Sequence, residues 1–171
     1  MFTLRCTSRL LKRLGVGELG EVTPTTCLGD WYANLLLARP QQLILAVSEL
    51  TLLPVVIPAR DSSSIVPRLA AAAGAILHAL GVPDDAIRDE RGQMVEAAIG
   101  KTANRRVLAI MNEFAFALRH RDEAKSLVDV ALWLAETPCK IRSEPGGYGF
   151  PDKMTREAFG GRRGRVKIQP C

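Results

Sequence analysis

The first third of the chain holds apolar residues in the lengths and alternations typical of β-strands. Four segments have this character: residues 2–7, 31–38, 43–48 and 52–57. Connections of four and three residues separate the last three of them, and connections this short favour antiparallel hairpins. Pro54 and Pro58 lack the backbone amide that a central strand needs, so we expect the last of the four at a sheet edge.

Further along the chain the apolar period becomes helical. Helices are expected over residues 9–14, 65–80, 104–118 and 123–136. Ser8 is a candidate cap for the first of these helices, and Thr102 or Asn104 for the third. Gly81 and Pro138 are suited to end the other two.

Two stretches between these helices complete the pattern. Residues 83–92, PDDAIRDERG, are expected to form an exposed acidic connection, and residues 93–99 one more strand. The pattern as a whole predicts an α+β fold. We expect a mostly antiparallel sheet of about four to five strands, with helices packed on one face.

The stretch LGDWYANLL places an acid and two large rings at the entrance of a predicted strand. Successive side chains of a strand alternate, so Trp31 and Tyr32 are expected on opposite faces of the sheet. The core face is assigned to Trp31 together with Ala33, Leu35 and Leu37. Asp30 lies just outside the strand, and we expect its removal to change stability little.

Composition limits the class of protein. A chain of 171 residues with 47% hydrophobic content is about one domain with a substantial core. No apolar run approaches the roughly 18 residues that cross a bilayer, and the first fifteen residues do not resemble a signal peptide. The four cysteines are far apart, without a CxxC pair, which favours a reduced, cytoplasmic protein without a metal site or cofactor.

The net charge is unevenly distributed. It is +5 in total, and residues 140–171 alone contain eight basic and three acidic side chains, so residues 1–139 are neutral. Five glycines between positions 146 and 161 add to the irregular character of this end. We therefore expect a single globular domain over residues 1–139 and a flexible basic tail over residues 140–171.

Five segments taken together resemble a known family. They are LRCT…LLKRL, LGDWYANLL, ELTLLPVVIP, KTANRRVLAIMNEFAF and LAETPC, in this order. They resemble an uncharacterised bacterial family, a domain of unknown function, over about residues 1–139. The resemblance supports one compact domain, and it implies no activity, cofactor or catalytic residue.

The strongest candidate for binding is a row on the predicted helix after Asn104. Arg105, Asn112 and Arg119 are seven residues apart and so lie nearly on one line. The guanidinium groups could hold phosphates while the amide reads a base edge. The same row also fits the ordinary solvent face of an amphipathic helix.

The tail offers a second basic group: Arg162, Arg163 and Arg165. A flexible segment of this kind can follow a nucleic-acid backbone, or it can simply be solvated. The leading hypothesis is a non-enzymatic cytosolic module that binds nucleic acid or a partner already bound to it. A protein-interaction domain with an acidic partner is an alternative, and no membrane partner is expected.

An enzyme of a different class is the other alternative. Asp30, Glu49 and Glu113 stand at ends of elements or beside apolar runs, and their convergence would suit a small hydrolase or nuclease. His78 and His120 invite a two-histidine ribonuclease hypothesis, although each suits a structural place. Cys139 is a candidate nucleophile, although a packed thiol is commoner.

Overall fold

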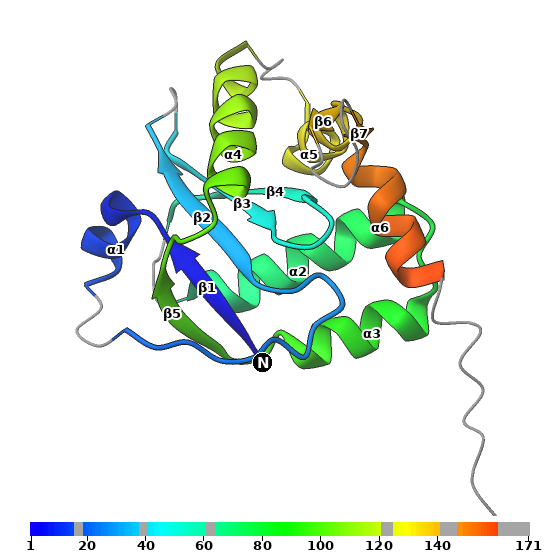
Figure 1. The fold of residues 1–171 in the computed structure, drawn as a ribbon, viewed down its shortest axis with the longest axis horizontal. Coiled ribbons are helices and arrows are strands. Elements are labelled where there is room, and N and C mark those ends of the chain that lie inside the picture. Colours follow the sequence, from blue (N-terminus) through cyan, green and yellow to red (C-terminus); the bar gives the residue numbers. More distant parts are fainter. Residues whose placement is uncertain (16–18, 38–40, 61–63, 121–124, 141–146, 161–171) are drawn as a thin grey trace, which may run out of the picture.

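The computed structural model describes residues 1–15, 19–37, 41–60, 64–120, 125–140 and 147–160 (Figure 1). The strands are β1 (Phe2–Cys6), β2 (Trp31–Leu36), β3 (Leu43–Ser48), β4 (Pro54–Pro58), β5 (Ala97–Lys101), β6 (Cys139–Lys140) and β7 (Tyr148–Gly149). The helices are α1 (Ser8–Leu14), α2 (Ile65–Ala79), α3 (Asp84–Gln93), α4 (Arg105–Ala117), the 3₁₀ turn η2 (Leu118–His120), α5 (Leu127–Ala135) and α6 (Pro151–Gly160). The α+β class is therefore confirmed.

Five strands form one mixed sheet in the order β4-β3-β2-β1-β5. The two hairpins predicted between β2, β3 and β4 are antiparallel, and the proline-containing β4 lies at an edge. The inner strand β1, between β2 and β5, instead pairs in parallel with both of them. The expectation of a mostly antiparallel sheet is corrected here. Long connections precede β2 and β5, and such connections return a chain in the parallel sense.

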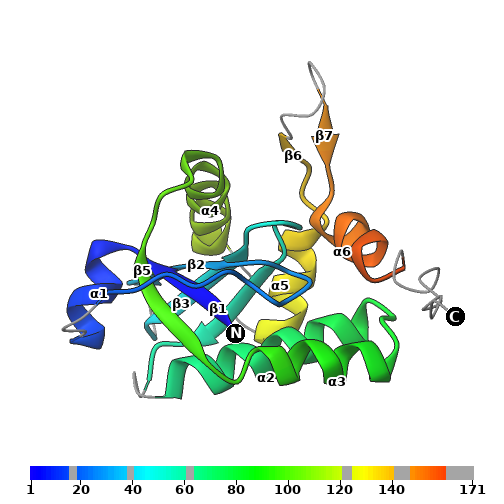
Figure 2. The same cartoon turned by 60° about the horizontal axis from the view of Figure 1, so that its bottom comes forward.

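Helices cover both faces of this sheet, and not one face as expected (Figure 2). We call the two sides the α2 face, which α2 and α3 cover, and the α4 face, which α4 covers. All six residues of β3 are buried, so this strand is a continuous apolar run that needs cover on both sides. The second layer of helices follows from that double burial.

Strand β2 alternates between the two faces as predicted. Trp31, Ala33 and Leu35 belong to the core on the α2 face, whereas Tyr32 belongs to the core on the α4 face. Leu37 was expected to share the face of Trp31, but it follows the end of β2 and is 64% exposed.

The acidic stretch 83–92, expected as an exposed connection, is most of helix α3. It joins α2 through Gly81, which has a left-handed φ of 77° and ends α2 as predicted. Ile87 is buried on the inner side of α3. The carboxylate of Glu90 is buried as well, and it accepts the backbone amides of Cys27 (2.7 Å) and Leu28 (3.0 Å). An acid that looked solvated in the sequence therefore fixes the loop before β2.

The described part of the C-terminal region is folded onto the body. In α6, Phe159 and Thr155 are buried, and the guanidinium of Arg156 donates to the carbonyl of Leu80 (3.1 Å). Residues 151–160 thus form a helix whose Phe159 belongs to the core on the α2 face. Arg162, Arg163 and Arg165 lie outside the described residues. Within the described ranges, no helix has the length and apolar character to cross a bilayer.

Candidate functional site

Helix α4 is the element that carries the predicted binding residues. The Asn104 side chain caps it by accepting the backbone amides of Arg106 (3.0 Å) and Val107 (3.5 Å). The inner side of the helix is buried by Val107, Ile110, Met111 and Phe114. The opposite side is left to solvent, as in other amphipathic surface helices.

Four residues form a row along this outer side and the turn η2 that continues it, and we call them the α4 row: Arg105, Asn112, Phe116 and Arg119. The three polar members are exposed, as the sequence predicted. Phe116 is 63% exposed, and its ring centroid lies 5.3 Å from that of His120 at an interplanar angle of 55°. Among the described residues, Arg105 and Arg119 take part in no ion pair. The α4 row thus offers two unpaired cations, one amide and one aromatic face.

The beginning of α4 is held to the sheet by a three-residue network. The phenol of Tyr32 accepts the backbone amide of Asn104 (3.2 Å) and donates to the carboxylate of Glu49 (3.3 Å). The side-chain amide of Asn104 donates to the same carboxylate oxygen (3.1 Å). Burial, as the largest cause, raises the pKa of Tyr32, so the phenol stays protonated. This network fixes where the α4 row begins.

A second polar network on the α4 face surrounds Asp30. Its buried carboxylate accepts the backbone amide of Thr3 (2.8 Å) and the Nε of Arg5 (3.0 Å). Arg5 also pairs with the exposed Glu21 at 2.7 Å and thereby lowers the pKa of that carboxyl. Asp30, just before β2, therefore joins the start of this strand to Thr3 and Arg5 of β1. The expectation that it contributes little to stability does not fit this burial and these bonds.

The alternative acidic site gains no support from this geometry. Asp30 is bound by Arg5, Glu49 is bound by Tyr32 and Asn104, and Glu113 is exposed in the middle of α4. No group of three or more metal-ligating side chains occurs in the part of the chain that the structure describes. The three carboxylates thus each have a separate setting, and they do not form a metal cluster.

The basic residues of α1 are only partly available. Arg13 donates to the side chain of Gln42 (2.6 Å) and to the carbonyl of Ala59 (2.7 Å). Arg9 and Lys12 are exposed. The basic residues of α1 are therefore less available for binding than Arg105 and Arg119 of the α4 row, which are exposed on one side.

The histidines and Cys139 do not form a catalytic set. His78 belongs to α2 and His120 to the turn after α4, which lie on opposite faces of the sheet (Figure 2). Cys139 is buried, and this burial, followed by the charge of Glu113, raises the pKa of its thiol to about 11. The thiol is therefore protonated at neutral pH and a poor nucleophile.

Sequence reasoning missed Phe116 and the anchor of α4. Phe116 could have been found, because it lies four residues after Asn112 and three before Arg119, on the same side of a helix. The anchor could not, because Tyr32 and Asn104 are far apart in the sequence and meet only through the path that follows β5.

The comparisons with known proteins give a family and no activity. No curated protein and no solved structure shows significant similarity to the chain. A family model described as a domain of unknown function, DUF6933, matches residues 3–154. This match includes all five strands of the main sheet, helix α4 and the beginning of α6, and extends past the expected boundary at residue 139. The chain therefore belongs to the DUF6933 family, a domain of unknown function.

Proposed function

We propose that this domain binds single-stranded nucleic acid through the α4 row, in the cytosol and without catalysing a reaction on it. The observation that carries the proposal is the coincidence of Arg105 and Arg119, which form no ion pair with the described residues, with the exposed ring of Phe116 on one side of α4 and the following turn η2. Cations along a backbone path, with an aromatic face on which bases stack, are the two components of single-strand binding. The reduced cysteines Cys6, Cys27 and Cys139 favour the cytosolic location.

The dimensions of the α4 row suit a short stretch of strand. Positions 105 and 119 are fourteen residues apart, which is about 21 Å along a helix axis. Arg105 and Arg119 would contact phosphates at the two ends, and Asn112 would meet a base edge between them. Phe116 would stack on the flat face of an unpaired base. In a duplex this face is covered by the adjacent stacked bases, so only a single strand offers it.

The test is a titration of a fluorescent single-stranded oligonucleotide with the full chain at several salt concentrations. The double variant Arg105→Gln/Arg119→Gln should lose affinity and reduce the magnitude of the salt slope by about 1.4, at roughly 0.7 per phosphate contact. The matched control is Arg88→Gln/Arg91→Gln, which removes the same charge from α3 on the other face of the sheet. Equal loss in both double variants would indicate non-specific attraction and contradict the proposal.

The aromatic component has its own variants. Phe116→Ala should weaken binding of the single strand about fivefold or more, because stacking contributes about 1–3 kcal/mol per base. Phe116→Leu keeps the apolar bulk without the aromatic face and should lose nearly as much. Tighter binding of a duplex than of a single strand, with Phe116→Ala unchanged, would refute the single-strand proposal. Binding of an acidic polypeptide but of no oligonucleotide would favour the protein-interaction alternative.

A further inference from the structure

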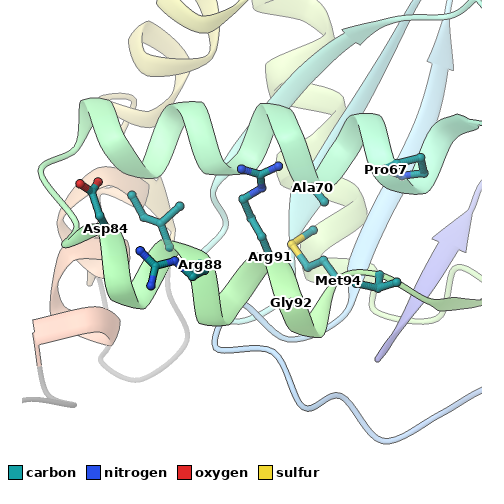
Figure 3. Close-up of a pocket in the computed structure, with 9 residues that line it drawn as sticks. Pro67, Ala70, Asp84, Arg88, Arg91, Gly92 and Met94 are labelled. Atoms are coloured by element: carbon teal, nitrogen blue, oxygen red, sulfur yellow. The ribbon is translucent and has the colours of Figure 1, made fainter.

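A groove runs between α2 and α3, on the side of the sheet away from α4 (Figure 3). Its volume is about 530 Å³, within the range of small-molecule sites. Nine residues line it: Pro67, Ala70, Asp84, Ile87, Arg88, Arg91, Gly92, Met94 and Val95. It shares no residue with the α4 row.

The two ends of the groove differ in chemistry. Pro67, Ala70, Met94 and Val95 make one end apolar, and Val95 is 70% exposed there although it is a large aliphatic side chain. Arg88 lies toward the other end, which Asp84 closes, and Arg91 lies between the two ends and reaches toward α2 (Figure 3). The groove is therefore amphipathic along its length.

The two arginines are free to bind an anion. They are three residues apart on α3 and so project from the same side of the helix. Neither takes part in an ion pair within the described parts of the chain. The neighbouring acid Asp84 is instead 3.4 Å from the imidazole of His78. Two guanidinium groups beside an apolar surface match a ligand with one acid group and an alkyl chain.

Gly74 on α2 makes the position of Arg91 possible. Arg91 reaches from α3 across to α2 (Figure 3), and a Cβ atom at position 74 would lie 2.7 Å from its Cδ. Gly74 is in the interior of a helix, where glycine costs about 0.5–1 kcal/mol relative to alanine. The absence of a side chain at this place thus leaves room for Arg91 along the wall of the groove.

We propose that the groove between α2 and α3 binds a small amphipathic anion, with its alkyl chain on the apolar end and its acid group on Arg88 and Arg91. The acid group is a carboxylate or a phosphate monoester, since a guanidinium binds both by paired hydrogen bonds. This site is independent of the α4 row.

The experiment titrates the full chain with octanoate, octyl phosphate and octanol, and follows binding by calorimetry and by backbone amide shifts. Both anions should bind saturably and shift amides of α2 and α3. Octanol should bind about tenfold or more weakly, because it lacks the charge-assisted bonds. The tighter of the two anions identifies the acid group. No saturable binding of either anion up to about 10 mM, or octanol binding as tightly as octanoate, would overturn the proposal.

Variants distinguish binding through Arg88 and Arg91 from non-specific binding to apolar surface. Arg88→Gln/Arg91→Gln should lower the affinity for octanoate about tenfold or more and leave the affinity for octanol unchanged. The matched control is Arg105→Gln/Arg119→Gln, which should bind octanoate normally. Gly74→Ala should displace the flexible Arg91 side chain and weaken octanoate binding several-fold, without lowering the melting temperature. Normal octanoate affinity in both the α3 double variant and Gly74→Ala would overturn the site.

Discussion

The two faces of the sheet each bury an apolar core, and they differ in how the aromatic residue at the start of β2 uses its polar atom. On the α2 face the core is apolar, and Trp31 is fully buried there with an indole Nε1 that meets no hydrogen-bond partner among the described residues. On the α4 face Tyr32, the next residue, is equally buried but uses its hydroxyl to hold Asn104 and Glu49. Apolar packing thus secures both faces, and on the α4 face the bonds of the Tyr32 hydroxyl also fix the beginning of α4 and of its outer row.

The largest effect is expected from Trp31→Ala. Removing a fully buried ring from the α2 face should lower the free energy of unfolding by about 3–5 kcal/mol, because the apolar contacts are lost and a cavity remains. Urea unfolding followed by circular dichroism measures it. The matched control is Trp133→Ala on α5, where the ring is 42% exposed, and it should cost less than about 1 kcal/mol. Equal costs at both positions would show that burial does not distinguish the two tryptophans.

The next effect is expected from Asp30→Ala, which leaves Arg5 and the Thr3 amide without their buried acceptor. The free energy of unfolding should fall by about 2–4 kcal/mol. Glu21→Ala removes the other, exposed partner of Arg5 and should change the free energy of unfolding much less, because solvent screens this pair. An unchanged free energy of unfolding in Asp30→Ala would agree with the small contribution expected from the sequence. It would contradict a stabilising role for the hydrogen bonds of Asp30 on this face.

A smaller effect is expected from Tyr32→Phe. The ring stays in the core, and only the hydroxyl that joins Asn104 and Glu49 is lost, so the cost should be about 0.5–1.5 kcal/mol. Hydrogen exchange should rise locally at the first turn of α4, while amides of α2 keep their protection. Uniform loss of protection across both faces would contradict a local role for this network.

These positions show how far the sequence alone could predict the fold. The alternation of Trp31 and Tyr32 and the two hairpins depend on neighbouring residues, and both were predicted. For the cap of α4 the sequence offered Thr102 or Asn104, and the structure has Asn104. Helix α3 was missed because Glu90 is an acid that the fold buries, and its partners Cys27 and Leu28 are distant in sequence. The parallel pairing of β5 with β1 likewise depends on the path of a long connection, which no local pattern encodes.

The candidate sites divide in the same way. The exposure of Arg105, Asn112 and Arg119 followed from helical periodicity, because only the spacing on one helix mattered. The groove needed two helices at a fixed distance and a glycine opposite Arg91, and it could not be predicted without the packing of α2 on α3.

A further effect, which both faces should share, is a loss of stability in alkaline solution. Burial raises the pKa of Cys6, on the α2 face, to about 12 and that of Cys139, on the α4 face, to about 11. A raised pKa means that the protonated thiol stabilises the fold below the unfolded pKa of about 8.5, and that this contribution is lost as the pH rises toward 11–12.

Urea unfolding between pH 8 and pH 10 should therefore show a decline in the free energy of unfolding, because these thiols ionise in the unfolded chain while they stay protonated in the folded one. The variant Cys139→Ala should show a shallower decline, because one of the two groups no longer titrates. An identical decline in this variant would assign the effect to other groups.

The central claim is that the two faces carry separate binding surfaces, the α4 row for a nucleic-acid strand and the α2–α3 groove for a small amphipathic anion. Backbone amide shifts of the isotope-labelled full chain, recorded with a single-stranded oligonucleotide and separately with octanoate, test it most directly. We predict that the oligonucleotide shifts amides of α4 and η2, that octanoate shifts amides of α2 and α3, and that neither ligand displaces the other. An oligonucleotide that shifts α3 and leaves α4 unchanged, or that competes with octanoate, would contradict the claim.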